Sequence, residues 1–119
     1  MLIKTFGSAV YGVEAITITI EVNWLEQVGK DPMIVGLPDS AVRESLQRVE
    51  SAFKTNGYNM PRTKVVVNMA PADIRKSGTA FDLPIAMGIL GASRQFSNHE
   101  HIHQYILMGE LSLNGELRP

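Results

Sequence analysis

The sequence predicts an α/β domain of the α+β kind, in which two helices pack on one mixed sheet. Residues 15–24 alternate between apolar even-numbered side chains and mostly polar odd-numbered ones, which is the period of a strand with one wet face. A different period follows, because apolar side chains at offsets 0, 4, 7 and 11 form one stripe of a helix: Val42, Leu46, Val49 and Phe53. A strand period and a helix period in one short chain favour helices packed against a sheet.

The predicted elements follow one another in the order β-β-β-α-β-α-β-β. They are a hairpin of Leu2–Val10 and 15–24 with Gly12 in its turn region, a strand Met33–Val35, a helix from Asp39 or Ser40 to Asn56-Gly57, a strand Lys64–Met69, a helix from Asp82 to Arg94, and a strand Tyr105–Leu113. Asn114-Gly115 then favours a type I′ turn with a short return strand. We expect one domain over residues 1–119, truncated at its C-terminal end.

Several side chains receive structural roles from this pattern. Asp39 or Ser40 is expected to cap the first helix, and Asp82 the second. Val49 and Phe53 are expected to be buried on the first helix. Its other face carries two i,i+4 pairs, Glu44 with Arg48 and Glu50 with Lys54.

Composition excludes several classes of site. The formal net charge is −1, so there is no broad basic field to hold nucleic acid. The chain contains no cysteine, which excludes disulfides, thiol catalysis and cysteine-based zinc sites. No apolar run approaches the roughly 18–20 residues that span a bilayer, and the N-terminus lacks a signal-peptide core. These features predict a soluble cytoplasmic protein without membrane partners.

Three segments are candidates for chemistry, each with a plainer structural alternative. The turn at residues 36–45 begins a helix and can bind an anion, although a capped turn is the favoured interpretation. The loop Ala70–Phe81 is the candidate functional loop, and its candidate residues are Asp73, Arg75, Lys76 and Thr79. We expect Asp73 to bond within the loop and Arg75 and Lys76 to be exposed. The alternating histidines His99, His101 and His103 can share a metal only if extended, and a solvated loop is favoured.

Two kinds of active site are missing from the sequence. No phosphate-binding loop of the form G-x-x-x-x-G-K-[ST] occurs, so the chain is not expected to bind or hydrolyse ATP by itself. A Ser/His/Asp order is not recognisable either. We therefore assign no catalytic residue and no metal ligand, and expect no cofactor in this chain.

Long motifs in order along almost the whole chain resemble the N-terminal domain of ComM/YifB-type magnesium chelatase-like AAA+ ATPases. They are Gly7-Ser8-Ala9 with Gly12 and Val22, Gly36-Leu37-Pro38-Asp39 before Ala41–Ser45, Asn68–Asp73 with Lys76, Gly78 and Phe81–Ala86, and Gly109–Pro119. The resemblance implies a fold similar to the proteolytic domain of Lon and the C-terminal domain of RadA, including a left-handed βαβ crossover. It also implies that an AAA+ module in the parent protein binds ATP and magnesium, forms a ring and acts in DNA remodelling or recombination.

The same resemblance bears on activity. Lon proteases carry a serine in a Gly-Pro-Ser-Ala-Gly turn, and Thr79 falls near that position in Ser77–Phe81. The lysine that partners this serine would lie beyond Pro119, so the Thr79 hydroxyl lacks a base. The favoured function is a non-catalytic domain for assembly or substrate engagement, with its own AAA+ domain, neighbouring ring subunits and DNA as partners. The alternatives are a degenerate or threonine-dependent Lon-like peptidase and a metal-handling domain that assists chelation.

Overall fold

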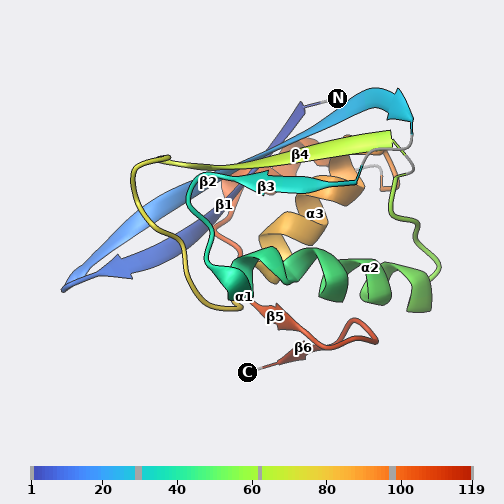
Figure 1. Ribbon diagram of the computed structural model, residues 1–119. Helices are drawn as coiled ribbons and strands as arrows, with labels where there is room; N and C mark the ends of the chain where they lie inside the picture. Colours follow the sequence, from blue (N-terminus) through green and yellow to red (C-terminus); the bar gives the residue numbers. More distant parts are fainter. Residues whose placement is uncertain (1, 29–30, 62, 97–98, 119) are drawn as a thin grey trace.

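A computed structural model describes residues 2–28, 31–61, 63–96 and 99–118 (Figure 1). The elements in chain order are β1 (Leu2–Tyr11), β2 (Glu14–Val28), β3 (Met33–Val35), α1 (Ser40–Arg43), α2 (Ser45–Thr55), β4 (Thr63–Ala70), α3 (Asp82–Ala92), the 3₁₀ helix η1 (His99–Gln104), β5 (Glu110–Leu111) and β6 (Leu117–Arg118). This order confirms the predicted fold class, two helices packed on a mixed sheet.

The main sheet has the strand order β1-β2-β4-β3. β2 pairs antiparallel with both β1 and β4, whereas β3 pairs parallel with β4. The alternation along β2 is confirmed, because Ile18, Ile20 and Val22 are fully buried while Thr17 is exposed. The left-handed sense of the crossover between β3 and β4, and the Lon-like assignment of the fold, stay predictions.

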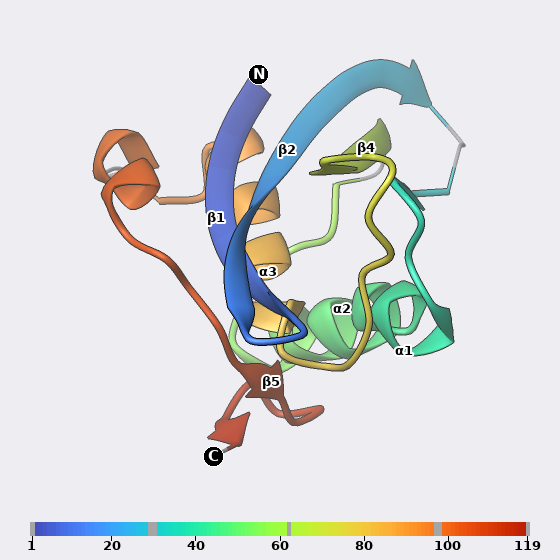
Figure 2. The same cartoon turned by 90° about the vertical axis from the view of Figure 1, so that its left-hand side faces the viewer.

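The helices cover one face of this sheet (Figure 2). Buried side chains of β2, β4, α2 and α3 form the core between the two layers. Val49 and Phe53 on α2 are 0% and 3% exposed, as predicted. α3 is apolar on all sides, which is typical of a helix that is enclosed by its neighbours. No helix among the described residues is long and apolar enough to cross a membrane.

The first helix differs from the prediction in one respect. The predicted single helix is divided at Glu44, which ends α1 and precedes α2. Asp39 caps α1 as expected, since its Oδ1 accepts a hydrogen bond from the Val42 amide at 2.8 Å. The predicted i,i+4 pair between Glu44 and Arg48 is wrong, because the Arg48 guanidinium turns to Asp82 on α3.

The C-terminal segment departs furthest from the prediction. In place of one strand over Tyr105–Leu113, the chain after η1 forms a single bridge between Ile106 and Phe6 and then the two-residue strand β5. β5 and β6 pair Leu111 with Leu117, so their loop has five residues and is not a two-residue type I′ turn. The side-chain amide of Asn56 donates a hydrogen bond to the main-chain oxygen of Asn114 at 2.8 Å, and this bond holds the longer loop in place.

Candidate functional site

The candidate functional loop, residues 70–81, begins where β4 ends and lies against the turn that precedes α1. The two segments form one parallel bridge between Pro38 and Lys76. The Lys76 amide donates to the Leu37 oxygen at 3.0 Å, and the Asp39 amide donates to the Lys76 oxygen at 2.9 Å. The middle of the loop is therefore attached to the start of the helix layer by main-chain bonds.

The buried side chain of Lys76 strengthens the contact between the loop and the turn, which contradicts the prediction that Lys76 is exposed. Its side chain is 0% exposed. The ammonium donates to the Gly36 oxygen at 2.8 Å and also to the Pro71 oxygen. Burial lowers the pKa of the Lys76 amine, while the field of the Asp73 carboxylate opposes that shift. The long apolar stem is enclosed and its charge is satisfied by carbonyl oxygens, a role that the polar sequence around it does not signal.

Gly36 makes the close approach of the turn to β4 possible. Its φ is +106°, and a Cβ at this position would lie 2.1 Å from the Met69 carbonyl oxygen. Only glycine fits this contact. The next residue, Leu37, also has a positive φ of 58° and is 51% exposed, so the turn holds a leucine in a conformation that side chains rarely adopt.

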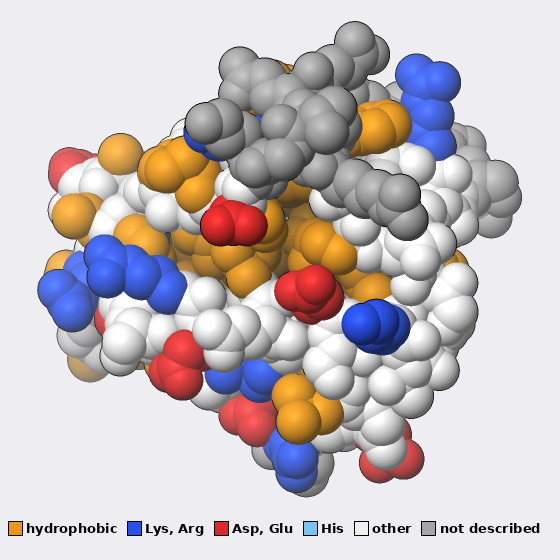
Figure 3. All heavy atoms as spheres, turned by 45° about the vertical axis from the view of Figure 1, so that its right-hand side comes forward, with side chains coloured by type: hydrophobic (Ala, Val, Ile, Leu, Met, Phe, Trp, Pro, Cys, Tyr) orange, Lys and Arg blue, Asp and Glu red, His pale blue; other side chains and the backbone are white. Residues whose placement is uncertain are grey.

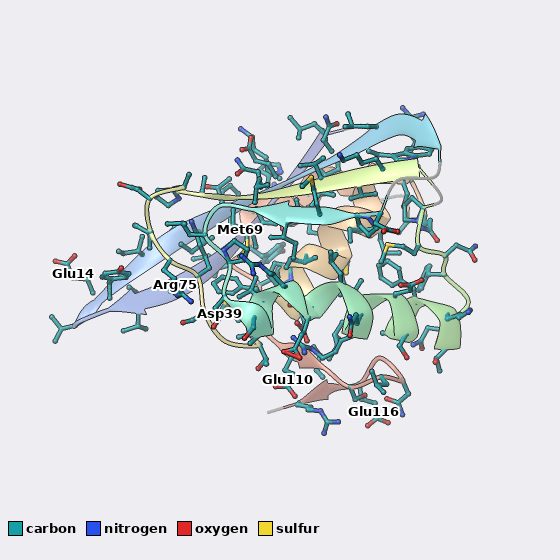
Figure 4. All side chains as sticks on the ribbon, in the orientation of Figure 1. Glu14, Asp39, Met69, Arg75, Glu110 and Glu116 are labelled. Carbon is teal, nitrogen blue, oxygen red and sulfur yellow. The ribbon has the colours of Figure 1, made fainter. Side chains whose placement is uncertain are left out.

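Asp39 links the turn to the second half of the loop. One oxygen of its carboxylate caps α1, and the other accepts from the Gly78 amide at 3.3 Å. Figure 4 shows Asp39 and Arg75 on these two neighbouring segments, close to the end of the molecule where β1 and β2 project. The turn and the loop thus form one continuous surface.

The charged side chains that the loop presents to solvent are Asp73 and Arg75. Both are exposed, as predicted for Arg75. The prediction that Asp73 bonds within the loop is wrong for the described residues, since its carboxylate acts on Lys76 only through its field. Thr79 is half-buried, and the Lys76 amine is occupied by the Gly36 and Pro71 oxygens. Lys76 therefore provides no base for the Thr79 hydroxyl.

Asp82 closes the loop but does not cap α3, contrary to the prediction. Phe81 occupies the cap position, and Asp82 is the first helical residue, fully buried. Its carboxylate accepts from Ser45 Oγ at 2.6 Å, from Arg48 Nε at 2.7 Å and Nη2 at 3.0 Å, and from the Leu111 amide at 3.1 Å. The hydrogen bond to Asp82 raises the pKa of Arg48. This buried cluster joins α2, α3 and β5.

Comparison with known proteins places the chain in a family. The sequence model of the family described as "Subunit ChlI of Mg-chelatase" matches residues 20–119. This chain belongs to the ChlI family. Within it, the chain is 44% identical to the uncharacterized protein YifB of Escherichia coli over 110 residues, 92% of this chain and 21% of YifB. It is 42% identical to the competence protein ComM of Haemophilus influenzae over 113 residues, 95% of this chain and 22% of ComM.

These relatives make it a ComM/YifB-type, magnesium chelatase-like member of the ChlI family. A protein of Mycobacterium tuberculosis is also similar, 33% identical over 116 residues, 98% of this chain and 23% of the relative. The chain spans about a fifth of the length of the curated relatives that it matches.

Grooves on the described surface of the chain are open to solvent. Among the described residues, no group of three histidine, aspartate or glutamate side chains is placed to hold a metal ion. The histidine segment falls in η1, and the side chain of His99 lies outside the described part. An open groove of about 300 Å³ is lined by apolar side chains of Pro32, Met33, Ile34 and Leu46 together with Arg43. Figure 3 shows hydrophobic side chains in a hollow on one face, bordered by charged ones.

Proposed function

We propose that this chain is a non-catalytic domain of a longer, ComM-type magnesium chelatase-like AAA+ ATPase. In this proposal the domain has a Lon-like fold, and the ATPase module outside it binds ATP and magnesium. The domain serves assembly of the ring or engagement of the substrate in DNA remodelling or recombination. Membership of the ChlI family and the length of the relatives support the proposal. The cysteine-free composition is compatible with a reducing cytoplasm, where we expect the protein to act.

The observation that carries the proposal is the construction of the candidate functional loop. Lys76 and Asp82 are buried, and their charged groups bind partners inside the domain. Asp73 and Arg75 are exposed to solvent. Hydrogen bonds to residues 36–39 fix the path of the loop between them. A loop with a fixed main chain and outward charges is suited to recognition, because little conformational entropy is lost when it binds.

The proposed contacts are charged ones. Arg75 is expected to meet an acidic side chain of a neighbouring subunit or a DNA phosphate. The peptidase alternative is disfavoured, because the Lys76 amine is bound to carbonyl oxygens and supplies no base for Thr79.

The test reverses the charge of Arg75 in the full-length protein. Arg75→Glu is compared with Lys54→Glu, which makes the same charge change at an exposed position on α2. We expect Arg75→Glu to lower DNA-stimulated ATP turnover at least several-fold, while Lys54→Glu leaves it near the wild-type value. Both variants of the isolated domain should melt within about 2 °C of wild type, because exposed substitutions change stability by less than about 0.5 kcal/mol. Equal turnover in all three proteins would refute the role given to the loop.

A further inference from the structure

β1 and β2 continue as a two-stranded arm beyond the rest of the sheet. β4 pairs with β2 only from Thr19 onward, whereas β1 and β2 stay paired as far as Tyr11 and Glu14. Gly12, with φ +63°, and Val13 form the two-residue turn at the tip. Figure 1 shows this arm projecting beyond the helices. Residues 14–18 of β2 therefore have a strand on one side only.

The main-chain groups on the open side can be assigned from two contacts of β1. The Phe6 oxygen accepts from the Leu107 amide, and the Ser8 amide donates to the Met108 sulfur, so even-numbered residues of β1 face away from β2. In an antiparallel ladder these directions alternate. Since β1 pairs odd residues with even residues of β2, the N–H and C=O groups of Ala15 and Thr17 point to the open edge. Within the described residues, no backbone hydrogen bond reaches these groups.

Natural sheets usually protect such an edge, and this one has little protection. The segment Ala15-Ile16-Thr17-Ile18 is rich in β-branched residues and contains no proline, lysine or bulge. Glu14 is its only flanking charge. The tip adds exposed apolar surface, because Val10 is 76% and Val13 102% exposed. The edge has the properties of a template for another strand.

We infer that the open edge of the arm pairs with the same edge of a second copy of this chain. The strands would run antiparallel about a two-fold axis with Ile16 opposite Ile16 of the second copy. Ala15 of each copy then faces Thr17 of the other. This register joins all the open groups of both residues in four main-chain hydrogen bonds and gives a four-stranded ribbon.

Length and charge favour a second copy as the occupant. Each arm offers five residues, 14–18, before its own β4 begins opposite Thr19. A second copy supplies a strand of the same five residues and then its turn, so that neither β4 is displaced. In this register Glu14 faces Ile18 of the second copy, and no like charges are opposed. The contact is small, which places it among weak, transient interfaces. The inference goes beyond the proposed function, because it rests on the arm and not on the candidate functional loop, and its test uses neither ATP nor DNA.

Charged residues at positions 15 and 17 test this register. Both side chains are exposed in the single chain, so the variants should fold like wild type. Ala15→Lys with Thr17→Glu places a lysine opposite a glutamate twice across the axis. Ala15→Lys with Thr17→Lys places two lysines opposite each other twice. Sedimentation equilibrium should show the dimer about 2- to 30-fold tighter than wild type in the first variant and weaker by a similar factor in the second.

A cysteine scan gives an independent measurement, because the chain has no cysteine of its own. Ile16→Cys should form a disulfide-linked dimer on mild oxidation, since position 16 meets itself across the axis. Thr17→Cys, which faces Ala15, should cross-link at least several-fold more slowly. Circular dichroism melts verify that each variant is folded. A chain that stays monomeric up to about millimolar concentration, charge variants with equal association, or equal cross-linking at 16 and 17 would overturn the inference.

Discussion

Replacing Asp82 by alanine should cost more stability than removing any exposed charge of this domain. The Asp82 carboxylate is fully buried and accepts four hydrogen bonds. Asp82→Ala leaves Arg48, whose side chain is only 18% exposed, without its counter-charge and leaves the Leu111 amide without an acceptor. Breaking a buried pair in this way costs about 3–5 kcal/mol. A domain of 119 residues has a total stability of about 6–18 kcal/mol, so the loss is a large fraction of it.

The assay is urea unfolding followed by circular dichroism, with Glu110→Ala as the matched control. Glu110 also pairs with an arginine, Arg118, but both side chains are at least one-third exposed, and the pair spans 3.2 Å. We expect Glu110→Ala to cost less than about 1 kcal/mol. In a thermal melt followed by the same signal, Asp82→Ala should lower the melting temperature by roughly 10–20 °C.

The double variant Arg48→Met with Asp82→Ala gives a second measurement if the single variant is too unstable to purify. Removing both charges should cost less than the sum of the single effects, because no uncompensated charge remains. Equal losses for Asp82→Ala and Glu110→Ala would refute the assignment of a buried anchoring role to Asp82.

Further predictions concern the core residue Phe53, the buried Lys76, and the binding of ATP and DNA. Phe53→Ala should cost roughly 3–5 kcal/mol in the same assay, because Phe53 is 3% exposed. Since burial lowers the pKa of Lys76, the unfolded chain holds this proton more tightly. The stability of wild type relative to Lys76→Met should therefore rise with pH between the lowered folded pKa and the ordinary lysine value near 10.4. Calorimetry with ATP and magnesium should detect no micromolar binding, since the chain lacks a phosphate loop. Filter binding should give DNA affinity well short of nanomolar at physiological salt, because the net charge is −1.

Sequence reasoning succeeded where one local period decides the structure. The alternation along β2 and the stripe on α2 each require a buried face, so Ile18 and Phe53 were placed correctly. Asp39 was also recognised, because a cap acts within three residues of the same segment. The prediction failed after Tyr105. There the apolar residues pack against β1 by single contacts, and an extended segment without a continuous partner does not become a strand.

The candidate site shows a different limit of sequence reasoning. Lys76 and Asp82 were expected in roles that polar side chains commonly fill, exposure and capping. Three of their partners, Gly36, Ser45 and Arg48, lie 34 to 40 residues away in the chain. Local pattern contains no information on contacts at that separation. The polar composition of the loop therefore predicted a functional surface but not which of its charges are available to a partner.

The contact between Gly36 and Met69 has a consequence for how this family can change over time. It joins two backbones directly, and the Lys76 ammonium also binds main-chain oxygens. The shape of the loop is consequently independent of the side chains at 73, 75 and 77. We expect related proteins to keep glycine at 36 and to vary these outward positions freely, so that one scaffold acquires different binding preferences without refolding.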